Sequence, residues 1–245
     1  MIERLRFCHL EGILEGKPNY AKIMVDVFGF QNRKLGRKFV FRKLFSKSYS
    51  LVEELKNLEI KSLTVPDNGT IKIPNKIDNI TFRAMMELNS LSNKDGSVVE
   101  LMGSTVAVAC YSENNDGDYD SSSEKFIKFK EKVMNSPLTE VVGIYNWIVK
   151  KLDESGSFWE KRFFEVEFQD EDYVNAGGES LKAFNVLNTI KKICKDFNLT
   201  YEEAWQLPYS ITQTNALESA TSNYVQRRMT ELKESKMRAE RKRKG

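Results

Sequence analysis

The residue types that most often carry out catalysis are few and scattered in this chain of 245 residues. The single histidine, His9, directly follows Cys8, so on a strand the two side chains would point to opposite faces. The other cysteines, Cys110 and Cys194, lie far apart along the chain. One histidine excludes sites that need two imidazoles, and the cysteine spacing indicates neither a disulfide framework nor a metal knuckle. We interpret the cysteines as reduced, buried, small hydrophobic residues.

An acidic loop, residues 113–124 (ENNDGDYDSSSE), has a composition found in calcium-binding loops. An EF-hand loop needs glycine at position six and a carboxylate at position twelve. Counted from Asp116, these positions are Ser121 and Ile127, and a loop counted from Asn114 fails in the same way. The loop is therefore interpreted as a solvated, mobile linker and not as a metal site.

Phosphate-binding and catalytic motifs are also missing from the sequence. Residues 175–180 (NAGGES) precede a predicted helix, but they match neither the P-loop nor the dinucleotide-binding spacing. Glu165 and Glu167 would share one face of a strand, yet in a chain with 35 acidic residues such pairs arise by coincidence. The sequence predicts no enzyme activity, no cofactor and no metal.

Two basic stretches remain as candidate binding surfaces, and the first is residues 32–50 (NRKLGRKFVFRKLFSKSYS). Its aromatic residues alternate with basic ones, and no acidic residue occurs between Asp26 and Glu53. Such a surface can neutralise phosphates and stack on bases, which is typical of a nucleic-acid groove. A hairpin with its aromatic residues packed inward and its charges in water, or a basic surface on an acidic protein ring, explains the same pattern. The basic residues are Arg33, Lys34, Arg37, Lys38, Arg42, Lys43 and Lys47.

The second basic stretch is the C-terminal end, where a narrow apolar stripe fades into charge. The stripe consists of Leu217, Thr221, Val225, Met229 and Leu232. Beyond Leu232 too little apolar surface remains to hold a helix against a core, so this end alone is expected to fray and to gain order on a partner. The basic residues that follow the stripe are Lys233, Lys236, Arg238, Arg241, Lys242, Arg243 and Lys244. We predict partner binding by the stripe together with these residues.

The elements that must position these surfaces begin with a β-containing N-terminal region, residues 1–75. Alternating β-branched and aromatic residues predict strands over 21–30 and 38–45, and a capping-box spacing predicts a short helix over 50–58. Asp67-Asn68-Gly69 between two apolar runs predicts a hairpin within 63–74.

Helical patterns dominate after Pro74. Cap residues and apolar spacing predict helices over 82–91, 98–111, 125–134, 138–152 and 181–197, whereas 158–168 reads as a helical turn running into a short strand. The expected N-caps include Ser97, Ser121 and Thr200, and Ser210 is expected to open the final helix. The predicted fold is α+β and mostly α, with a small β-containing N-terminal region, a helical body over 76–169 that contains the acidic loop, and a C-terminal helical region over 170–245 that ends in a long basic helix. No uncharged apolar run approaches the roughly 18 residues of a membrane span.

The order of these segments resembles tail, neck and baseplate proteins of tailed bacteriophages, especially tail-assembly-chaperone-like families. The resemblance covers about residues 70–245 and rests on "TFRAMMEL" after "IKIP" and on "FNLTYEEAWQLPYS" before a long charged helix. In those families the type Leu-Thr/Ser-x-x-Glu-Ala before a Leu-Pro turn is frequent. Here it comprises Leu199, Thr200, Glu203, Ala204, Leu207 and Pro208.

The resemblance implies a protein without catalysis or cofactor that works in many copies. Its implied partners are other phage structural proteins, and its implied location is the virion, or the host cytoplasm during assembly. Nucleic-acid binding by the basic-aromatic stretch is the alternative function, since that stretch is not part of the resemblance.

Overall fold

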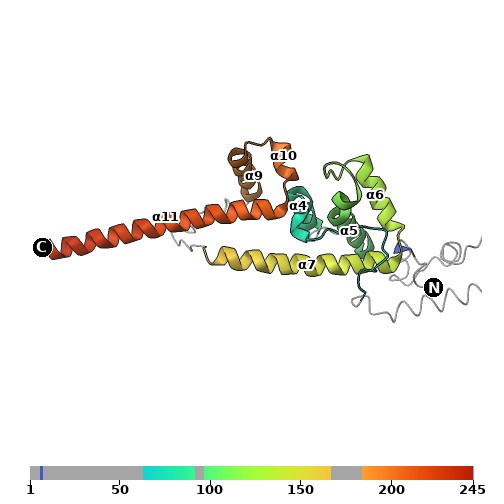
Figure 1. Cartoon of the computed structure of the whole chain (residues 1–245), viewed down its shortest axis with the longest axis horizontal. Helices are drawn as coiled ribbons and strands as arrows, with labels where there is room; N and C mark the ends of the chain where they lie inside the picture. Colours follow the sequence, from blue (N-terminus) through green and yellow to red (C-terminus); the bar gives the residue numbers. More distant parts are fainter. Residues whose placement is uncertain (1–5, 8–62, 92–96, 167–183, 245) are drawn as a thin grey trace, which may run out of the picture. The chain divides into compact units, whose positions relative to one another are not determined.

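The computed structural model describes residues 6–7, 63–91, 97–166 and 184–244. The helices in these residues are the 3₁₀-helix η4 (Ile77–Asn79) and the α-helices α4 (Phe82–Leu91), α5 (Val98–Asn114), α6 (Glu124–Met134), α7 (Leu138–Phe164), α9 (Asn185–Phe197), α10 (Tyr201–Gln206) and α11 (Tyr209–Lys244) (Figure 1). Across the same residues there is no strand, although isolated bridge residues occur, as between Arg6 and Pro137. The predominantly helical fold is confirmed. The strands predicted over 21–30 and 38–45 and the helix predicted over 50–58 lie outside the described residues.

The chain forms two compact units, Met1–Leu152 and Asp153–Gly245, with the boundary inside α7. The three-part division expected from the sequence stays a prediction.

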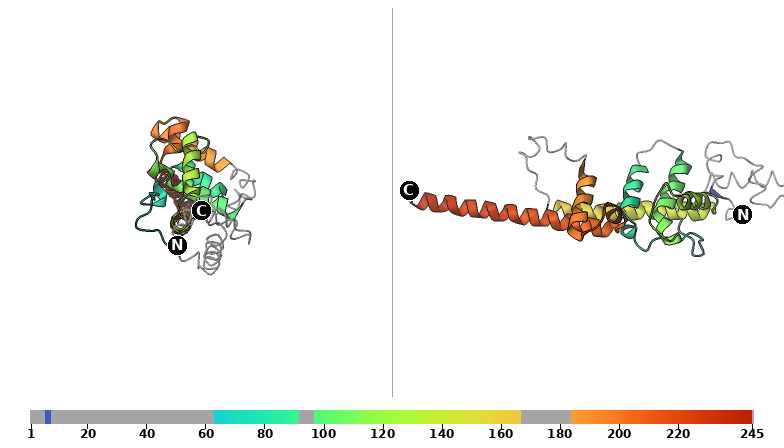
Figure 2. Two further views of the ribbon diagram at one scale, coloured as in Figure 1. Left: turned by 90° about the vertical axis from the view of Figure 1, so that its right-hand side faces the viewer. Right: turned by 90° about the horizontal axis from the view of Figure 1, so that it is seen from above.

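In the first unit, α5 lies between α4 and α6 and contributes more buried hydrophobic residues than any other described helix (Figures 1 and 2). Ten of its residues are buried, so its weak amphipathicity reflects a helix covered on most sides. Tyr111 of α5 packs edge-on against Tyr119 and contacts Phe126 and Phe129 of α6. These aromatic contacts fix α6 and the preceding loop against α5.

The hairpin predicted within residues 63–74 is wrong. The turn itself forms, because the Gly69 N–H donates to the Pro66 carbonyl at 3.3 Å across Asp67 and Asn68. The segments on either side of the turn are not strands and do not pair with each other. The turn that Asp67-Asn68-Gly69 indicates was predicted correctly, but the predicted pairing between the two flanking segments was wrong.

Side chains of α5 and α7 take the place of a second strand. We call residues 63–72 the strap. The Leu63 carbonyl accepts from Asn146 Nδ2 at 3.0 Å. The Lys72 N–H donates to Asn114 Oδ1 at 3.0 Å, and Asn114 Nδ2 donates back to the Lys72 carbonyl at 2.8 Å. The strap therefore satisfies its backbone groups on helices.

The middle of the strap is held by α7. Glu140, a buried carboxylate with 2% exposure, accepts from the N–H groups of Thr70 and Ile71. A Cβ at Gly143 would lie 2.2 Å from the Thr64 carbonyl oxygen, so only glycine permits this approach.

Three helix boundaries differ from their predictions. The cap of α6 is Ser123, which accepts from the Phe126 N–H, and not Ser121. Asp120 accepts from the Ser122 N–H and hydroxyl, and this local turn delays the start of the helix. The helix α7 continues through the segment predicted as a turn and strand to Phe164. Finally, α11 begins one residue before the predicted cap, at Tyr209.

The second unit joins α9, α10 and α11 through two tight corners. The first corner places Asn198, the C-cap of α9, in the left-handed region at φ 53°. The predicted capping box follows: the Thr200 hydroxyl accepts from the Glu203 N–H, and Glu203 accepts from the Thr200 N–H at 2.8 Å. Pro208 then separates α10 from α11. Ile190 and Ile193 are the buried residues of α9, whereas other members of its predicted apolar face, Phe184, Leu187 and Phe197, are exposed.

Candidate functional site

The second half of α11 is the largest exposed element of its unit, and it extends past α9 and α10 (Figures 1 and 2). Every residue over 225–241 is exposed. Three apolar side chains of the predicted stripe are half in water: Val225 at 48%, Met229 at 52% and Leu232 at 56%. A helix that buries none of these side chains has no packing of its own to hold it.

These three residues form one face because they are spaced by four and then three positions. The same spacing continues backwards to Ser222 and Glu218, which line a hollow against α9. The stripe therefore continues a face that α9 covers at its beginning and leaves open beyond it.

The remaining predicted partner-binding residues are distributed around α11. Leu217 is half-buried and lies on a different side from Met229. Lys236 continues the stripe, while Arg238 and Arg241 are exposed on other faces. Lys242, Arg243 and Lys244 belong to the last turn of α11. Whether this end frays when isolated stays a prediction.

Charge along this segment is strongly positive. Residues 225–245 contain nine basic and three acidic residues, a net charge of +6. Two acids are paired within the helix, Glu231 with Arg228 at 2.8 Å and Glu234 with Arg238 at 3.6 Å. These pairs are exposed and contribute little to stability, so the positive charge remains available to a partner.

Met237 is an exposed apolar residue that the sequence analysis missed, with the same 52% exposure as Met229. It lies about 110° around the helix axis from the centre of the stripe. Its signal in the sequence was only an isolated apolar residue among charges.

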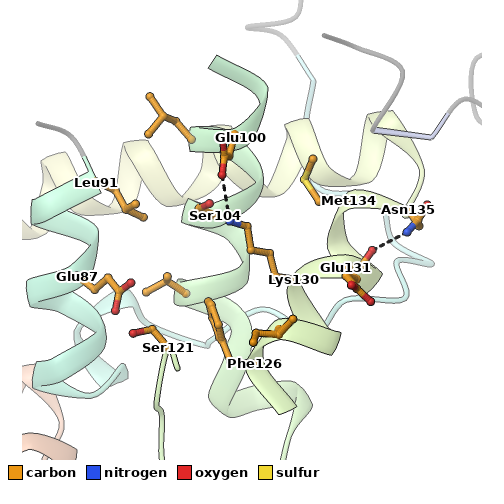
Figure 3. A pocket seen from close by; sticks show the side chains of 13 residues that line it. Glu87, Leu91, Glu100, Ser104, Ser121, Phe126, Lys130, Glu131, Met134 and Asn135 are labelled. Atoms are coloured by element: carbon orange, nitrogen blue, oxygen red, sulfur yellow. Dashed lines mark hydrogen bonds and ion pairs between the residues drawn. The ribbon is translucent and has the colours of Figure 1, made fainter. Parts of the chain in front are cut away.

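The first unit carries a groove of about 630 Å³ between α4, α5 and α6 (Figure 3). Its wall is apolar where Leu101, Phe126, Ile127 and Met134 line it. Three carboxylates line it as well, and they are those of Glu87, Glu100 and Glu131. One cation, Lys130, forms an ion pair with Glu100 at 3.5 Å, which Figure 3 shows across the groove. The lining therefore combines apolar surface with an excess of negative charge.

The acidic loop beside this groove is mostly exposed, as the sequence predicted, but it has a buried anchor that the prediction of a solvated linker did not include. Tyr119 in its middle is fully buried and donates to Glu87 Oε2 at 2.9 Å. It also packs edge-on against Phe126 at 5.4 Å between ring centroids. Burial, followed by the negative charge of Glu87, raises the pKa of Tyr119 well above its ordinary value. The aromatic anchor holds the loop in place, and Asp116 and Asp118 remain exposed beside it.

The hollow between α9 and α11, of about 640 Å³, is polar. One of its two carboxylates, Asp196, accepts from Lys192 and from Asn215 Nδ2, and the other is that of Glu218. Hydrogen bonding to Lys192 and then to Asn215 lowers the pKa of Asp196. The bond from Asn215 joins α9 to α11.

The structure describes only some of the other residues that the sequence analysis considered as candidates for chemistry or binding. Cys110 is buried, and burial raises its pKa to about 12, so this thiol has no nucleophilic role near neutral pH. Cys194 is only partly buried, contrary to the prediction for it. Cys8, His9, residues 175–180 and the basic residues Arg33, Lys34, Arg37, Lys38, Arg42, Lys43 and Lys47 lie outside the described residues.

Two absences hold for the part of the chain that the structure describes. No group of three or more His, Cys, Asp or Glu side chains could hold a metal ion there. None of the helices described is both long enough and apolar enough to cross a membrane.

Comparison with protein-family models, curated proteins and solved structures finds no match to this chain.

Proposed function

We propose that this protein is a non-enzymatic structural or assembly protein of a tailed bacteriophage, in its tail, neck or baseplate, and that α11 is its partner-binding element. The observation that carries the proposal is the uncovered stripe of Val225, Met229 and Leu232 within residues 225–245, which carry a net charge of +6. Helices of this kind bind by laying the apolar face in a groove while their charges select the partner.

The fold and the sequence pattern support an assembly role in complementary ways. The capping box at Thr200 and Glu203 forms as expected, and Pro208 separates the capped helix α10 from α11. The exposed end of α11 supplies a contact surface for neighbouring phage proteins.

The test is infection with a phage that encodes the chain without residues 233–245. We expect the shortened protein to accumulate in the infected cell but to be lost from particles or from the assembly intermediate that contains the full chain. Mass spectrometry of purified particles beside the lysate measures both pools. Normal incorporation of the shortened chain, or absence of the full chain from every particle and intermediate, would contradict the proposal.

A nucleic-acid-binding function is the alternative, and one observation in the sequence favours it. Seven basic residues over 33–47 alternate with aromatic residues, and no acid occurs between Asp26 and Glu53. Binding through this stretch predicts an affinity for DNA or RNA that falls steeply with salt, because each neutralised phosphate releases counterions. Replacing Arg37, Lys38 and Arg42 by alanine should then reduce the salt dependence. Absent or salt-insensitive binding would remove this alternative.

A further inference from the structure

The groove between α4, α5 and α6 has the chemistry of a docking site for a basic, apolar helix. Phe126 and Ile127 of α6 and Leu101 of α5 line it, and Ile127 is 50% exposed. Glu87 and Glu131 lie at opposite ends of the lining. A helix that entered the groove would bury apolar side chains between carboxylates.

The exposed end of α11 presents the matching chemistry. Its stripe, Val225, Met229 and Leu232, is as narrow as one row of side chains. Basic residues flank it, with Arg228 one position before Met229 and Lys233 one position after Leu232. The stripe would supply the apolar contact, and the flanking cations would meet the carboxylates of the groove.

Charge is unevenly distributed along the chain. Residues 1–62 carry +6 and residues 225–245 carry +6, while residues 63–224 carry −9, of which −2 falls on residues 63–152, so the acidic excess at the groove is that of its lining carboxylates. The acidic loop, which Tyr119 fixes beside the groove, adds exposed carboxylates at Asp116 and Asp118. Two basic ends against each other would repel, so side-by-side pairing of two α11 ends is disfavoured.

We propose that the end of α11 from one copy of this chain docks in the α4–α5–α6 groove of a second copy. This inference rests on the proposed assembly function and names the partner of α11 within it. The contact is heterologous, since the helix and the groove are different surfaces, and repetition of such a contact produces a ring or a filament.

The first part of the test is sedimentation velocity of the full chain over a range of concentrations. We expect association that increases with concentration and weakens as salt is added, because exposed charges contribute to the contact. Two full-length variants should each weaken it by about thirtyfold or more: Met229→Asp/Leu232→Asp in α11, and Ile127→Glu in the groove. All three positions are at least half exposed, so the substitutions leave the core intact.

The decisive part is the mixture of the two variants. The Ile127→Glu chain retains a normal α11, and the Met229→Asp/Leu232→Asp chain retains a normal groove. We expect them to restore a single contact and to form a one-to-one complex that does not grow further. Matched controls are Met237→Asp, which places the same change on another face of α11, and Val98→Glu, an exposed apolar residue outside the groove lining. Both controls should associate as the unaltered chain does.

Several results would overturn the inference. The unaltered chain could remain monomeric at every concentration, the Ile127→Glu chain could associate normally, or the two variants could fail to combine. Hydrogen exchange that is slow over 225–241 in a dilute monomer, and that Ile127→Glu accelerates, would show docking within one chain. Capture of α11 by nucleic acid without self-association would replace the second copy by a different partner.

Failure of this inference and failure of the proposed function are distinguishable. If the chain is monomeric but still needs residues 233–245 for incorporation into particles, the assembly function is supported and the self-docking is rejected. If the chain associates with itself but occurs in no particle or intermediate, the self-docking is supported and the assembly function is rejected.

Discussion

Glu140 is the residue whose removal we expect to disturb the first unit most specifically. It is buried, it comes from α7, and its carboxylate accepts from two consecutive backbone N–H groups of the strap, those of Thr70 and Ile71. Charged hydrogen bonds of this type contribute about 1.5–3 kcal/mol each, and loss of the acceptor would leave the N–H of the buried Ile71 unpaired.

We predict that Glu140→Ala lowers the free energy of unfolding of the first unit by about 3 kcal/mol or more. Urea denaturation measures the loss, and hydrogen exchange should locate it at the amides of Thr70 and Ile71. Glu131→Ala, on the exposed surface of α6, is the matched control and should change stability by less than about 0.5 kcal/mol. Equal effects of the two substitutions would contradict the anchoring role of Glu140.

Tyr119 gives a prediction about pH. Its folded-state pKa is raised by burial and by the charge of Glu87, so the unfolded chain releases this proton first as pH rises. The stability that the neutral phenol contributes is complete below the ordinary tyrosine pKa of about 10 and declines above it. Tyr119→Phe should be less stable than the unaltered chain at neutral pH by about 1 kcal/mol, through loss of the hydrogen bond to Glu87.

The comparison that decides this prediction is the difference in unfolding free energy between the two chains from neutral pH to pH 11. We expect the difference to shrink above about pH 10, because only the unaltered chain has this proton to lose. Tyr201→Phe, at a half-exposed phenol, serves as the control for general effects of alkaline pH. A difference that stays constant across this range would show that Tyr119 does not titrate as its buried position requires.

At the scale of elements, the corner before α11 depends on the capping box of α10. This helix has only six residues, Tyr201–Gln206, so local caps matter more for it than for longer helices. The Glu203 carboxylate also accepts from the Thr200 hydroxyl at 2.7 Å, and hydrogen bonds to the Thr200 hydroxyl and then to its N–H lower the pKa of Glu203.

We predict that Thr200→Ala costs the second unit about 1 kcal/mol, within the range measured for N-cap replacements. Faster hydrogen exchange at the Glu203 amide should accompany the loss. Because the folded-state pKa of Glu203 is lowered, its contribution is present above the ordinary glutamate pKa and disappears as pH falls through the folded-state value. Thr221→Ala on the exposed side of α11 is the control, and it should be neutral or slightly stabilising. A control that is as destabilising as Thr200→Ala would contradict the capping account.

The helices could be predicted from the sequence because their signals are local. Apolar spacing and cap residues lie within a few positions of each other, and α4, α5, α6, α9 and α10 appear where those signals place them. The hairpin could not be predicted correctly, because the hydrogen-bond partners of its backbone are side chains such as Asn114 and Asn146, far along the chain. The segment 158–168, predicted as a helical turn running into a short strand, is helical through Phe164, and Arg162 lies over the Phe158 ring there at 4.9 Å. Residues 167–168 lie outside the described residues.

The candidate surfaces were predictable to different extents. The stripe on α11 is a sequence pattern, so Val225, Met229 and Leu232 were found without the structure. The groove was not, because it combines residues of α4, α5 and α6 that are separated along the chain. Tyr119 was hidden within a polar loop, and one aromatic residue among acids carries no local sign that it will be buried.

At the scale of the whole molecule, the small net charge of +3 conceals two basic ends around an acidic centre. The distribution explains how a nearly neutral protein can present strong local fields to a partner. Removal of either end is therefore expected to change the net charge, and removal of the C-terminal end is also expected to leave the rest of the chain folded.

Removing residues 225–245 is therefore predicted to reverse the net charge of the protein while leaving the two units folded. These residues carry +6, so a chain that ends at Tyr224 carries −3. Every described side chain over 225–241 is exposed, so their loss removes little buried apolar area, and the unfolding free energy should change by less than about 0.5 kcal/mol. The shortened chain should no longer be retained on a cation exchanger near neutral pH. Its circular dichroism spectrum should lose the helical signal of the missing turns, and its unfolding midpoint should stay the same as that of the full chain. A full-length chain in which Lys233, Lys236 and Arg238 are replaced by glutamine controls for charge alone. A large drop in the midpoint on truncation, but not on charge replacement, would show that the end of α11 packs against its own chain and does not await a partner.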